Sequence, residues 1–375
     1  MDLEKAYDRV ERDRLWKVMS EYGVEDKLIR GVASLYGESS AAVRVNSGLS
    51  DWFSLTKGVK QGCVMSPWLF NIFIDHCIRP LKELNIGIEM NGLIACMLMF
   101  ADDMVLLAES KCDLQKQVSC VYENCKMNGL SMNVSKTKIL VFERENVRTE
   151  CVIKIGDECL EQVNEYVYLG SLFSREGKCD LEIERRKMAG NRMIGVLRPI
   201  TSSQNVSMKA ITLLHKAILL PTIMYGSETW TWSKKDESGM NAVEMRALRR
   251  MCGVRLIDRV KNERVRELCE CKQSVVNRMK VNKLRWFGHV ERMDEERLTK
   301  NVYDAERQGA RKRGRPRMRW IDHLETILRD GKVPSTRRKR ACMKNVMNVC
   351  EAKSVCKDRS VWRSVLSAYP ERDTA

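Results

Sequence analysis

The sequence lacks a long apolar run. A membrane-spanning helix needs about 20 consecutive apolar residues, whereas charged residues make up 31% of this chain and interrupt its hydrophobic stretches. The first residues, Met1-Asp2-Leu3-Glu4-Lys5, also lack the apolar core of a secretory signal peptide. These absences predict a chain with no membrane partner that is not secreted and works in the nucleus, the cytoplasm or both.

The 15 cysteines lack the spacing of a structural zinc site. Cys252, Cys269, Cys271 and His289 are the available ligands, and no Cys-x2-Cys pair occurs among them. In a reducing compartment cysteines serve as small buried hydrophobic residues, which is the use we expect here. The chain also lacks a fixed-period repeat and a long low-complexity tract, which argues against a solenoid.

Basic residues greatly outnumber acidic residues in the second part of the chain. Residues 1–150 hold 19 Lys and Arg against 21 Asp and Glu, a balance of -2, which leaves 47 against 29 and a balance of +18 for residues 151–375. Such a one-sided excess favours a polyanion, and nucleic acid above all, as the partner of the second part. A basic surface that serves only solubility is the alternative.

The spacing of apolar residues predicts the α+β class. Up to residue 174, helices over 11–22, 68–84 and 112–128 alternate with short strands. The helical period dominates afterwards, with helices predicted over 178–198, 207–220, 236–252, 260–270, 273–287 and 320–330. A chain of 375 residues has room for two or three domains.

Two adjacent carboxylates, Asp102 and Asp103, lie between apolar runs at 97–100 and 104–108. This pattern predicts a β-hairpin whose turn carries both acids. Because carboxylates lose hydration between apolar strands, a divalent cation bound by oxygen ligands would offset the cost. An ordinary acidic turn is the alternative, and the pair taken alone favours it.

Two further segments are candidates to complete a site. The segment from Gly58 to Pro67 contains Gln61-Gly62, whose glycine permits close approach to a ligand, and Ser66-Pro67, which starts a buried helix. Asp2 lies a hundred residues before Asp102, so only the fold can bring the two together. The joint occurrence of these segments indicates a nucleotide or template site.

In this order the motifs resemble the palm of a reverse transcriptase of the non-LTR (LINE-type) retrotransposon class. Residues 2–8 are similar to the first catalytic motif, 58–70 to the Gln-Gly-x-x-x-Ser-Pro motif, and 100–103 to the aromatic-x-Asp-Asp signature. Residues 129–138 resemble the next motif, and Tyr168-Leu169-Gly170 resembles the primer-grip turn. A looser resemblance continues to about residue 330, through 284–290 and 314–320.

The resemblance implies a fold in which a palm, built from an antiparallel sheet with packed helices, is followed by an all-helical thumb and a basic C-terminal region. The implied boundaries are 1–174 for a palm without fingers, 175–255 for the helical thumb-like region, 256–330 for the basic helical region and 331–375 for a basic tail. The implied activity is RNA-directed DNA polymerisation by two-metal nucleotidyl transfer. Its partners would be an RNA template, a DNA primer or target DNA, and a dNTP substrate.

The family's site residues can be carried over by position. Asp2 and Asp102 would hold two Mg²⁺ ions, with Mn²⁺ as an alternative, and Asp103 would be a helper ligand. Lys136 is the candidate general acid for pyrophosphate, and a solvated surface lysine is an alternative of nearly equal weight. The nucleotide-binding and primer-binding residues implied by the resemblance are Tyr7 as a steric gate against a 2′-hydroxyl, Gln61 and Gly62 at the base-pair pocket, and Tyr168, Leu169 and Gly170 at the primer end.

The match departs from the family at its start. Only Met1 precedes Asp2, where the family has a palm strand, and the fingers and the N-terminal endonuclease of many relatives have no counterpart. Chain termini tend to fray, and displacing a catalytic group by about 1 Å can cost about 10²-fold in rate. We therefore expect a truncated or decayed copy, or a gene model begun at an internal methionine, with little or no polymerase activity. A catalytically inactive remnant that binds nucleic acid is the alternative, and a decayed reading frame without a role is a third.

Residues 311–320 form a basic segment without an acid. Its core, 313–317, resembles an AT-hook, an extended segment that lies in the A·T-rich minor groove. A general phosphate-binding loop is an alternative of at least equal weight. The nucleic-acid-binding residues predicted in this segment are Arg311, Lys312, Arg313, Arg315, Arg317 and Arg319.

Overall fold

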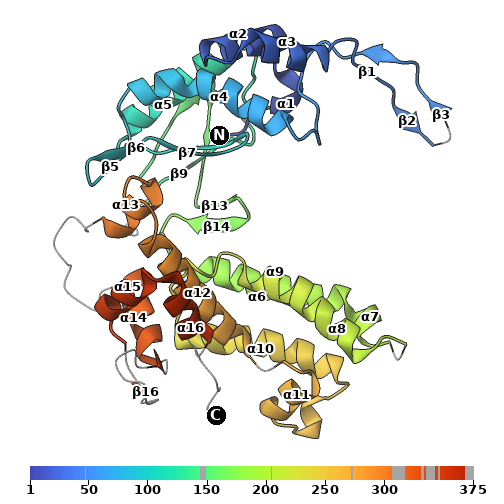
Figure 1. The fold of residues 1–375 in the computed structure, drawn as a ribbon, viewed down its shortest axis with the longest axis vertical. Coiled ribbons are helices and arrows are strands. Elements are labelled where there is room, and N and C mark those ends of the chain that lie inside the picture. The colour runs from blue at the N-terminus through green and yellow to red at the C-terminus, as the bar shows by residue number, and fades with distance from the viewer. Residues whose placement is uncertain are drawn as a thin grey trace. The chain divides into compact units, whose positions relative to one another are not determined.

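The computed structural model describes residues 1–46, 48–143, 149–203, 205–271, 273–305, 317–330, 333–334, 343–344 and 347–367. The chain divides into two units, Met1–Asn164 and Glu165–Ala375 (Figure 1). The first unit mixes helices with short strands and the second is mainly helical, which agrees with the α+β class predicted from the sequence. The palm and thumb assignments and the boundaries at 174, 255 and 330 remain predictions.

The core of the first unit lies around one buried helix. This helix, α4 (Ser66–Glu83), has Pro67 in its first turn, as predicted, and buries Phe70, Phe73 and Ile74, which share one face. It packs against α2 and α5. On its exposed side Asp75 accepts hydrogen bonds from Lys82 at 2.5 Å and from the Tyr22 hydroxyl at 2.6 Å. The other helices of this unit are α1 (Ala6–Arg9), α2 (Arg12–Glu21), α3 (Asp26–Ser34) and α5 (Lys111–Met127).

The strands of the first unit pair two by two in the part of the chain that the structure describes. The antiparallel pairs are β1 (Ser40–Ala41) with β4 (Phe53–Ser54), β2 (Arg44–Val45) with β3 (Gly48–Leu49), β5 (Ile88–Met90) with β6 (Leu93–Ala95), β7 (Met97–Phe100) with β8 (Asp103–Leu106), and β10 (Lys154–Ile155) with β11 (Glu158–Cys159). β9 (Lys138–Leu140) pairs with β12 (Glu161–Val163) in parallel.

The resemblance implied a palm with an antiparallel sheet, and the parallel β9–β12 pair departs from that expectation. The β9–β12 pair is parallel because the chain crosses over through the β10–β11 hairpin before it returns, and parallel strands require such a crossover. Strands of two to four residues also offer too few ladder bonds to recruit further neighbours.

The second unit begins with the hairpin β13 (Glu165–Tyr168) and β14 (Ser171–Ser174) and continues as helices. All six long helical stretches predicted from the periodicity are found. The helices are α6 (Asp180–Val196), α7 (Arg198–Thr201), α8 (Met208–Leu214), a π-helix (His215–Leu219), α9 (Leu220–Met224), α10 (Lys234–Met251), a 3₁₀-helix (Leu256–Asp258), α11 (Asn262–Leu268), α12 (Val275–Glu291), α13 (Leu298–Asp304), α14 (Trp320–Asp330), α15 (Val349–Cys356) and α16 (Arg359–Ser367), with the strand pair β15 (Val333–Pro334) and β16 (Met343–Lys344).

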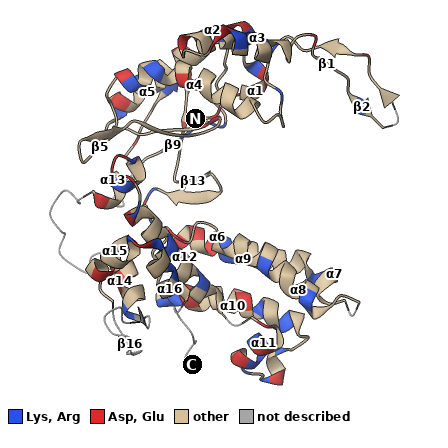
Figure 2. Ribbon diagram, viewed as in Figure 1, with Lys and Arg blue, Asp and Glu red and all other residues tan. Residues whose placement is uncertain are grey.

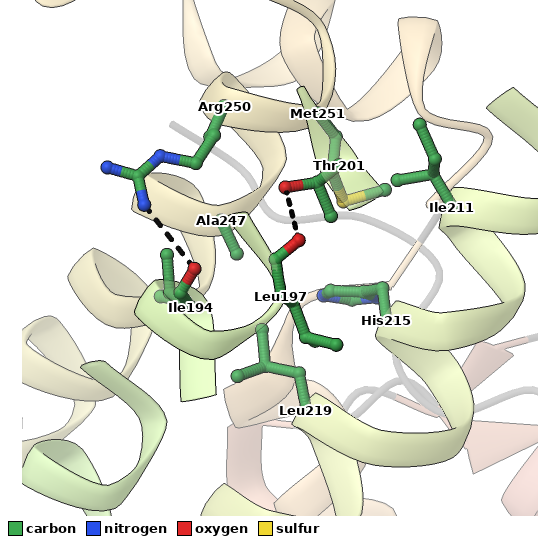
Figure 3. A pocket seen from close by; sticks show the side chains of 9 residues that line it. All are labelled: Ile194, Leu197, Thr201, Ile211, His215, Leu219, Ala247, Arg250 and Met251. Carbon is green, nitrogen blue, oxygen red and sulfur yellow. Dashed lines mark hydrogen bonds between the residues drawn. The ribbon is translucent and has the colours of Figure 1, made fainter. Parts of the chain in front are cut away.

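The π-helix places His215 in a small hollow of about 20 Å³ between α6, α8 and α10 (Figure 3). The imidazole is 3% exposed, and neither ring nitrogen has a hydrogen-bond partner. Burial, together with the nearby charges of Arg278 and Arg266, lowers the pKa of His215 to about 4. The ring is therefore neutral at physiological pH and serves as a packed core side chain.

Gly288 allows α12 and α16 to pack in close contact. A Cβ at this position would lie 2.3 Å from Nε1 of the buried Trp362, whose indole donates to the Leu284 carbonyl at 3.2 Å. We expect Gly288→Ala to lower the free energy of unfolding by about 2–3 kcal/mol, because overpacking forces a buried ring to move. Gly195→Ala on α6 is the matched control, since a Cβ there meets nothing within 4 Å.

In urea denaturation the Gly195 variant should gain up to about 1 kcal/mol from helix propensity. Equal midpoints for the two variants would contradict the close α12–α16 contact.

None of the helices in the described parts of the chain is both long and apolar enough to cross a membrane.

Candidate active site

The hairpin predicted around Asp102 and Asp103 is confirmed. β7 and β8 pair from Met97↔Leu106 to Phe100↔Asp103, so that Ala101 and Asp102 form a two-residue turn. Ala101 has a φ of 52°, which is uncommon for a residue other than glycine, asparagine or aspartate. The tight turn places the Asp102 carboxylate at the end of the hairpin and Asp103 at the first position of β8.

The N-terminal segment lies beside this hairpin and positions Asp2. The Met1 nitrogen donates to the Met104 carbonyl at 2.5 Å, and the Met104 N–H donates to the Met1 carbonyl at 3.2 Å. On the other side, the Asn133 N–H donates to the Asp2 carbonyl at 2.9 Å and Leu3 forms a bridge with Met132. The backbone of this segment is hydrogen-bonded on both sides, and the low activity expected from its place at the start of the chain stays a prediction.

The three carboxylates share one electrostatic environment. Burial raises the pKa of Asp103, and the negative charges of Asp102 and Asp2 raise it further. Burial likewise raises the pKa of Tyr7, with a smaller contribution from Asp102. The fold therefore brings together Asp2, Asp102, Asp103 and Tyr7, which lie up to a hundred positions apart in the sequence.

The site fits a hard cation through the chemistry of its donors. Asp2 Oδ2 is buried and has no hydrogen-bond partner, and Lys136 Nζ lies 3.8 Å away, in the range of an ion pair. A buried carboxylate oxygen that accepts no hydrogen bond and lies beside two like charges is costly unless cations, such as Lys136 or a metal ion, offset its charge. Among the described residues, however, no three His, Cys, Asp or Glu side chains are gathered tightly enough to form a complete metal-ligand set.

Tyr7 lies on α1 with its ring stacked on Phe70 of α4, at a centroid distance of 4.5 Å and an interplanar angle of 15°. The loop that carries Gln61 and Gly62 docks against the same helix, because the Val59 N–H donates to the Tyr7 carbonyl at 2.8 Å. Gln61 Nε2 donates to Asp8 Oδ1 at 3.1 Å. The nucleotide-binding residues implied by the resemblance thus adjoin one another around α1.

The two glycines of this loop have different uses. A Cβ on Gly58 would lie 2.9 Å from the Asp8 carbonyl oxygen, so this glycine serves the contact between the loop and α1 rather than a ligand. Gly62 has a φ of 81° and would meet nothing within 4 Å. Its backbone has the room that a ligand would need.

Arg12 is a residue whose role the sequence did not reveal. Its guanidinium donates to the carbonyls of Tyr36 at 3.0 Å, Leu55 at 2.7 Å and Gly58 at 3.0 Å, and so fixes the start of the loop that leads to Gln61. The accepting carbonyls belong to the backbone, which any residue type supplies. No residue pattern could therefore have identified these contacts.

Cys63 follows Gly62 at the start of α4. Backbone N–H groups of Met65 and Ser66 stabilise its thiolate, and they lower the pKa of this thiol. At pH 7 we expect iodoacetamide to alkylate Cys63 about fivefold faster than the exposed Cys112, because the thiolate is the reactive form. The advantage should shrink as the pH rises through 9, where ordinary thiols ionise as well.

Mass spectrometry of the modified peptides measures both rates, with Cys63→Ser as the control for assignment. Alkylation of Cys112 at the same rate as Cys63 at pH 7 would show that the backbone N–H groups do not stabilise the thiolate.

The other predicted residues lie in the second unit. Tyr168 ends β13, and Leu169 and Gly170 form the turn of the β13–β14 hairpin. Arg311, Lys312, Arg313 and Arg315 lie outside the described residues. Arg317 donates to the Glu176 carbonyl at 2.8 Å, and Arg319 pairs with Asp322 at 2.7 Å.

Lys and Arg residues are present on α6, α8, α10, α11 and α12 of the second unit, in keeping with the basic excess of the sequence (Figure 2). Acidic residues lie among them on most of these helices. Several form ion pairs with their neighbours, among them Glu182 with Arg186 and Glu237 with Lys280.

Comparisons with known proteins give the following matches. Residues 1–173 match the family described as reverse transcriptase (RNA-dependent DNA polymerase). A transposon-derived protein of Caenorhabditis elegans is 29% identical over 292 residues, which cover 74% of this chain and 97% of that protein. Because this alignment is longer than the segment matched by the family, the similarity extends into the second unit.

Longer relatives match part of their length. The Pol polyprotein of the type-1 retrotransposable element R2 of Nasonia vitripennis is 26% identical over 232 residues, 58% of this chain and 22% of the polyprotein. The corresponding protein of the element R2DM of Drosophila melanogaster is 27% identical over 187 residues, 48% of this chain and 18% of the polyprotein. The chain thus spans about a fifth of these two polyproteins.

Proposed function

We propose that the chain belongs to the reverse transcriptase family and is an RNA-directed DNA polymerase, because residues 1–173 match that family and retrotransposable-element Pol polyproteins are among its relatives. It would extend a DNA primer or nicked target on an RNA template with dNTP substrates. The observation that supports this proposal best is the convergence of Asp2 with the Asp102-Asp103 hairpin. The charges of Asp2 and Asp102 raise the pKa of the neighbouring Asp103, and a bound cation would offset this repulsion.

Asp2, Asp102 and Asp103 are the residues that would hold two Mg²⁺ or Mn²⁺ ions. When bound, such ions supply Lewis-acid charge that lowers the pKa of the attacking 3′-hydroxyl and offsets the charge of the triphosphate. Met1 is hydrogen-bonded to Met104, and the Asp2 carbonyl accepts from the Asn133 N–H, so the backbone on both sides would orient this carboxylate before substrate arrives. Lys136, whose Nζ lies 3.8 Å from Asp2 Oδ2, would donate a proton to the departing pyrophosphate.

The ring of Tyr7 would select the sugar. Its stacking on the fully buried Phe70 holds the ring in place, and a rigid ring can exclude a 2′-hydroxyl by contact. Gln61, held by Asp8, and the unobstructed backbone at Gly62 would border the base pair. The Tyr168-Leu169-Gly170 turn would hold the primer end. Residues Arg311, Lys312, Arg313, Arg315, Arg317 and Arg319 would contact phosphates.

Primer extension tests the proposal. The full chain should incorporate dTMP on a poly(rA)/oligo(dT) template-primer with Mg²⁺ or Mn²⁺, and EDTA should abolish the incorporation. Asp102→Ala is the control for contaminating polymerases. If the wild-type chain and the Asp102→Ala variant give the same incorporation with either metal, the proposal is wrong. Salt-sensitive binding of the template-primer without incorporation would instead favour a protein that only binds nucleic acid.

A further inference from the structure

The Leu169–Gly170 turn has a backbone conformation that needs support. Leu169 has a φ of 45° and Gly170 a φ of 78°, and the flanking residues Tyr168 and Ser171 pair directly across the hairpin. A two-residue turn with positive φ at both positions matches the twist of a hairpin, and asparagine or aspartate usually occupies its first position. Leucine gains no local hydrogen bond from its side chain there, so contacts from elsewhere must stabilise this conformation.

Side chains from α6 and from the segment after α9 supply those contacts. The Tyr225 hydroxyl donates to the Leu169 carbonyl at 2.8 Å. Arg185 donates to the Gly170 carbonyl at 3.1 Å, and the Arg186 guanidinium donates to the same oxygen. Both carbonyls of the turn are therefore occupied by side chains of its own unit.

These side chains are themselves fixed. Arg186 donates to Glu182 at 2.6 Å and lies 4.7 Å over the Tyr225 ring. The Glu182 side chain is 3% exposed, and its other oxygen accepts the Leu172 N–H at 2.9 Å, one residue beyond the start of β14. Charge-assisted bonds in a buried setting are the strong ones. Arg186 thus joins a buried carboxylate, an aromatic ring and the turn.

The outer side of the turn is open. Leu169 is 40% exposed, although its backbone is strained. A Cβ on Gly170 would lie 3.4 Å from the Tyr225 ring, so glycine lets the turn approach that ring closely. A strained, exposed turn that is fixed from behind by buried charges is typical of a segment that must keep its shape to contact a ligand.

We propose that Arg186, together with Glu182 and Tyr225, is a positioning residue for the primer end. This inference rests on the proposed function, in which the Tyr168-Leu169-Gly170 turn holds the primer. Arg186 does not contact the primer. It keeps the turn in the conformation that does, by donating to Gly170 and by orienting the tyrosine that donates to Leu169.

The test measures recognition of a primer end separately from incorporation. Fluorescence anisotropy without dNTP compares a labelled DNA primer with a recessed 3′-end on an RNA template against a blunt RNA–DNA duplex of the same length. The wild-type full chain should bind the recessed end about tenfold more tightly, a difference within the range of a few directed hydrogen bonds. Arg186→Met should abolish this preference and leave the affinity for the blunt duplex unchanged.

Two further variants separate positioning from folding. Tyr225→Phe keeps the ring beneath Arg186 and removes only the hydroxyl, and should reduce the preference about threefold, as expected for one hydrogen bond. Arg192→Met removes an exposed arginine from the same helix and should leave the preference intact. Where the wild-type chain is active, Arg186→Met should raise the KM for template-primer and leave the KM for dTTP unchanged.

The outcomes are distinguishable. A wild-type chain without preference for the recessed end overturns the positioning role, even if it incorporates nucleotides. An equal loss of affinity for both duplexes in Arg186→Met and in Tyr225→Phe overturns it as well, because the residues would then serve the fold alone. A preference that depends on Arg186 in a chain that incorporates nothing would refute the polymerase proposal and retain the positioning role.

Discussion

Replacing Asp2 by asparagine should abolish nucleotide incorporation by the full chain without weakening its fold. Asp2 Oδ2 is buried without a hydrogen-bond partner, and its charge raises the pKa of Asp103. The amide keeps the shape of the side chain and removes the repulsion. Since loss of a charged metal ligand costs several kcal/mol of transition-state stabilisation, we expect about 10³-fold less incorporation. Mn²⁺ binding, followed by electron paramagnetic resonance, should weaken in parallel.

The matched control is Asp75→Asn on α4. Asp75 pairs with Lys82 and Tyr22, so its replacement should lower the free energy of unfolding slightly and leave incorporation and Mn²⁺ binding unchanged. An Asp2→Asn chain that keeps more than a tenth of the wild-type incorporation would show that this carboxylate is not a metal ligand. An unchanged Mn²⁺ affinity would lead to the same conclusion in a chain without measurable incorporation.

Replacing Lys283 by methionine should remove a pH dependence from the stability of the second unit. Lys283 is fully buried, donates to the Trp230 carbonyl at 2.6 Å, and lies 5.1 Å from the Trp232 ring and 5.0 Å from the Trp320 ring. His323 Nδ1 is 2.9 Å away, and burial lowers the pKa of that imidazole to about 3. Burial likewise lowers the pKa of Lys283 from 10.5 to about 7.

Between these two pKa values of Lys283 the unfolded chain binds a proton that the folded chain does not. The free energy of unfolding should therefore rise with pH across the window from 7 to 10.5, by up to about 1.4 kcal/mol per pH unit from this group. Below pH 7 the folded state carries the full cost of a buried charge. The difference in free energy of unfolding, Lys283→Met minus wild type, should therefore be about 3 kcal/mol larger at pH 7 than at pH 9.5.

Urea denaturation followed by tryptophan fluorescence at several pH values measures this difference. Loss of the hydrogen bond to the Trp230 carbonyl changes the free energy of unfolding of the variant by the same amount at every pH. The slope of that free energy against pH therefore reports the titration of Lys283. Lys280→Met, on the same helix but paired with Glu237 at 3.4 Å, should keep the wild-type slope. If Lys283→Met keeps the wild-type slope, the charge of Lys283 in the wild-type protein is in contact with solvent.

The sequence predicted the elements well because their signals are local. The Ser66-Pro67 start of α4, the helical apolar spacing from Asp180 to Glu291, and the Asp102-Asp103 turn each depend on residues within a few positions of one another. Strand pairing was predicted less well, and the parallel β9–β12 pair replaced part of an expected antiparallel sheet. Partner choice depends on the path of residues 141–160, which no period of apolar residues encodes.

The site likewise has some residues that the sequence predicted and some contacts that only the fold reveals. Asp102 and Asp103 were predicted as a cation site because such a site needs carboxylates, and the roles of Asp2, Tyr7 and Gln61 were implied by the family resemblance. The sequence also predicted the resemblance to the reverse transcriptase family, because five ordered motifs extend over about 170 residues.

Only the tertiary structure decided that Asp2 is held between Met104 and Asn133, that Gly58 serves Asp8 rather than a ligand, and that Arg186 supports the Leu169–Gly170 turn. These contacts involve backbone atoms, which every residue has, so the residue types do not predict them.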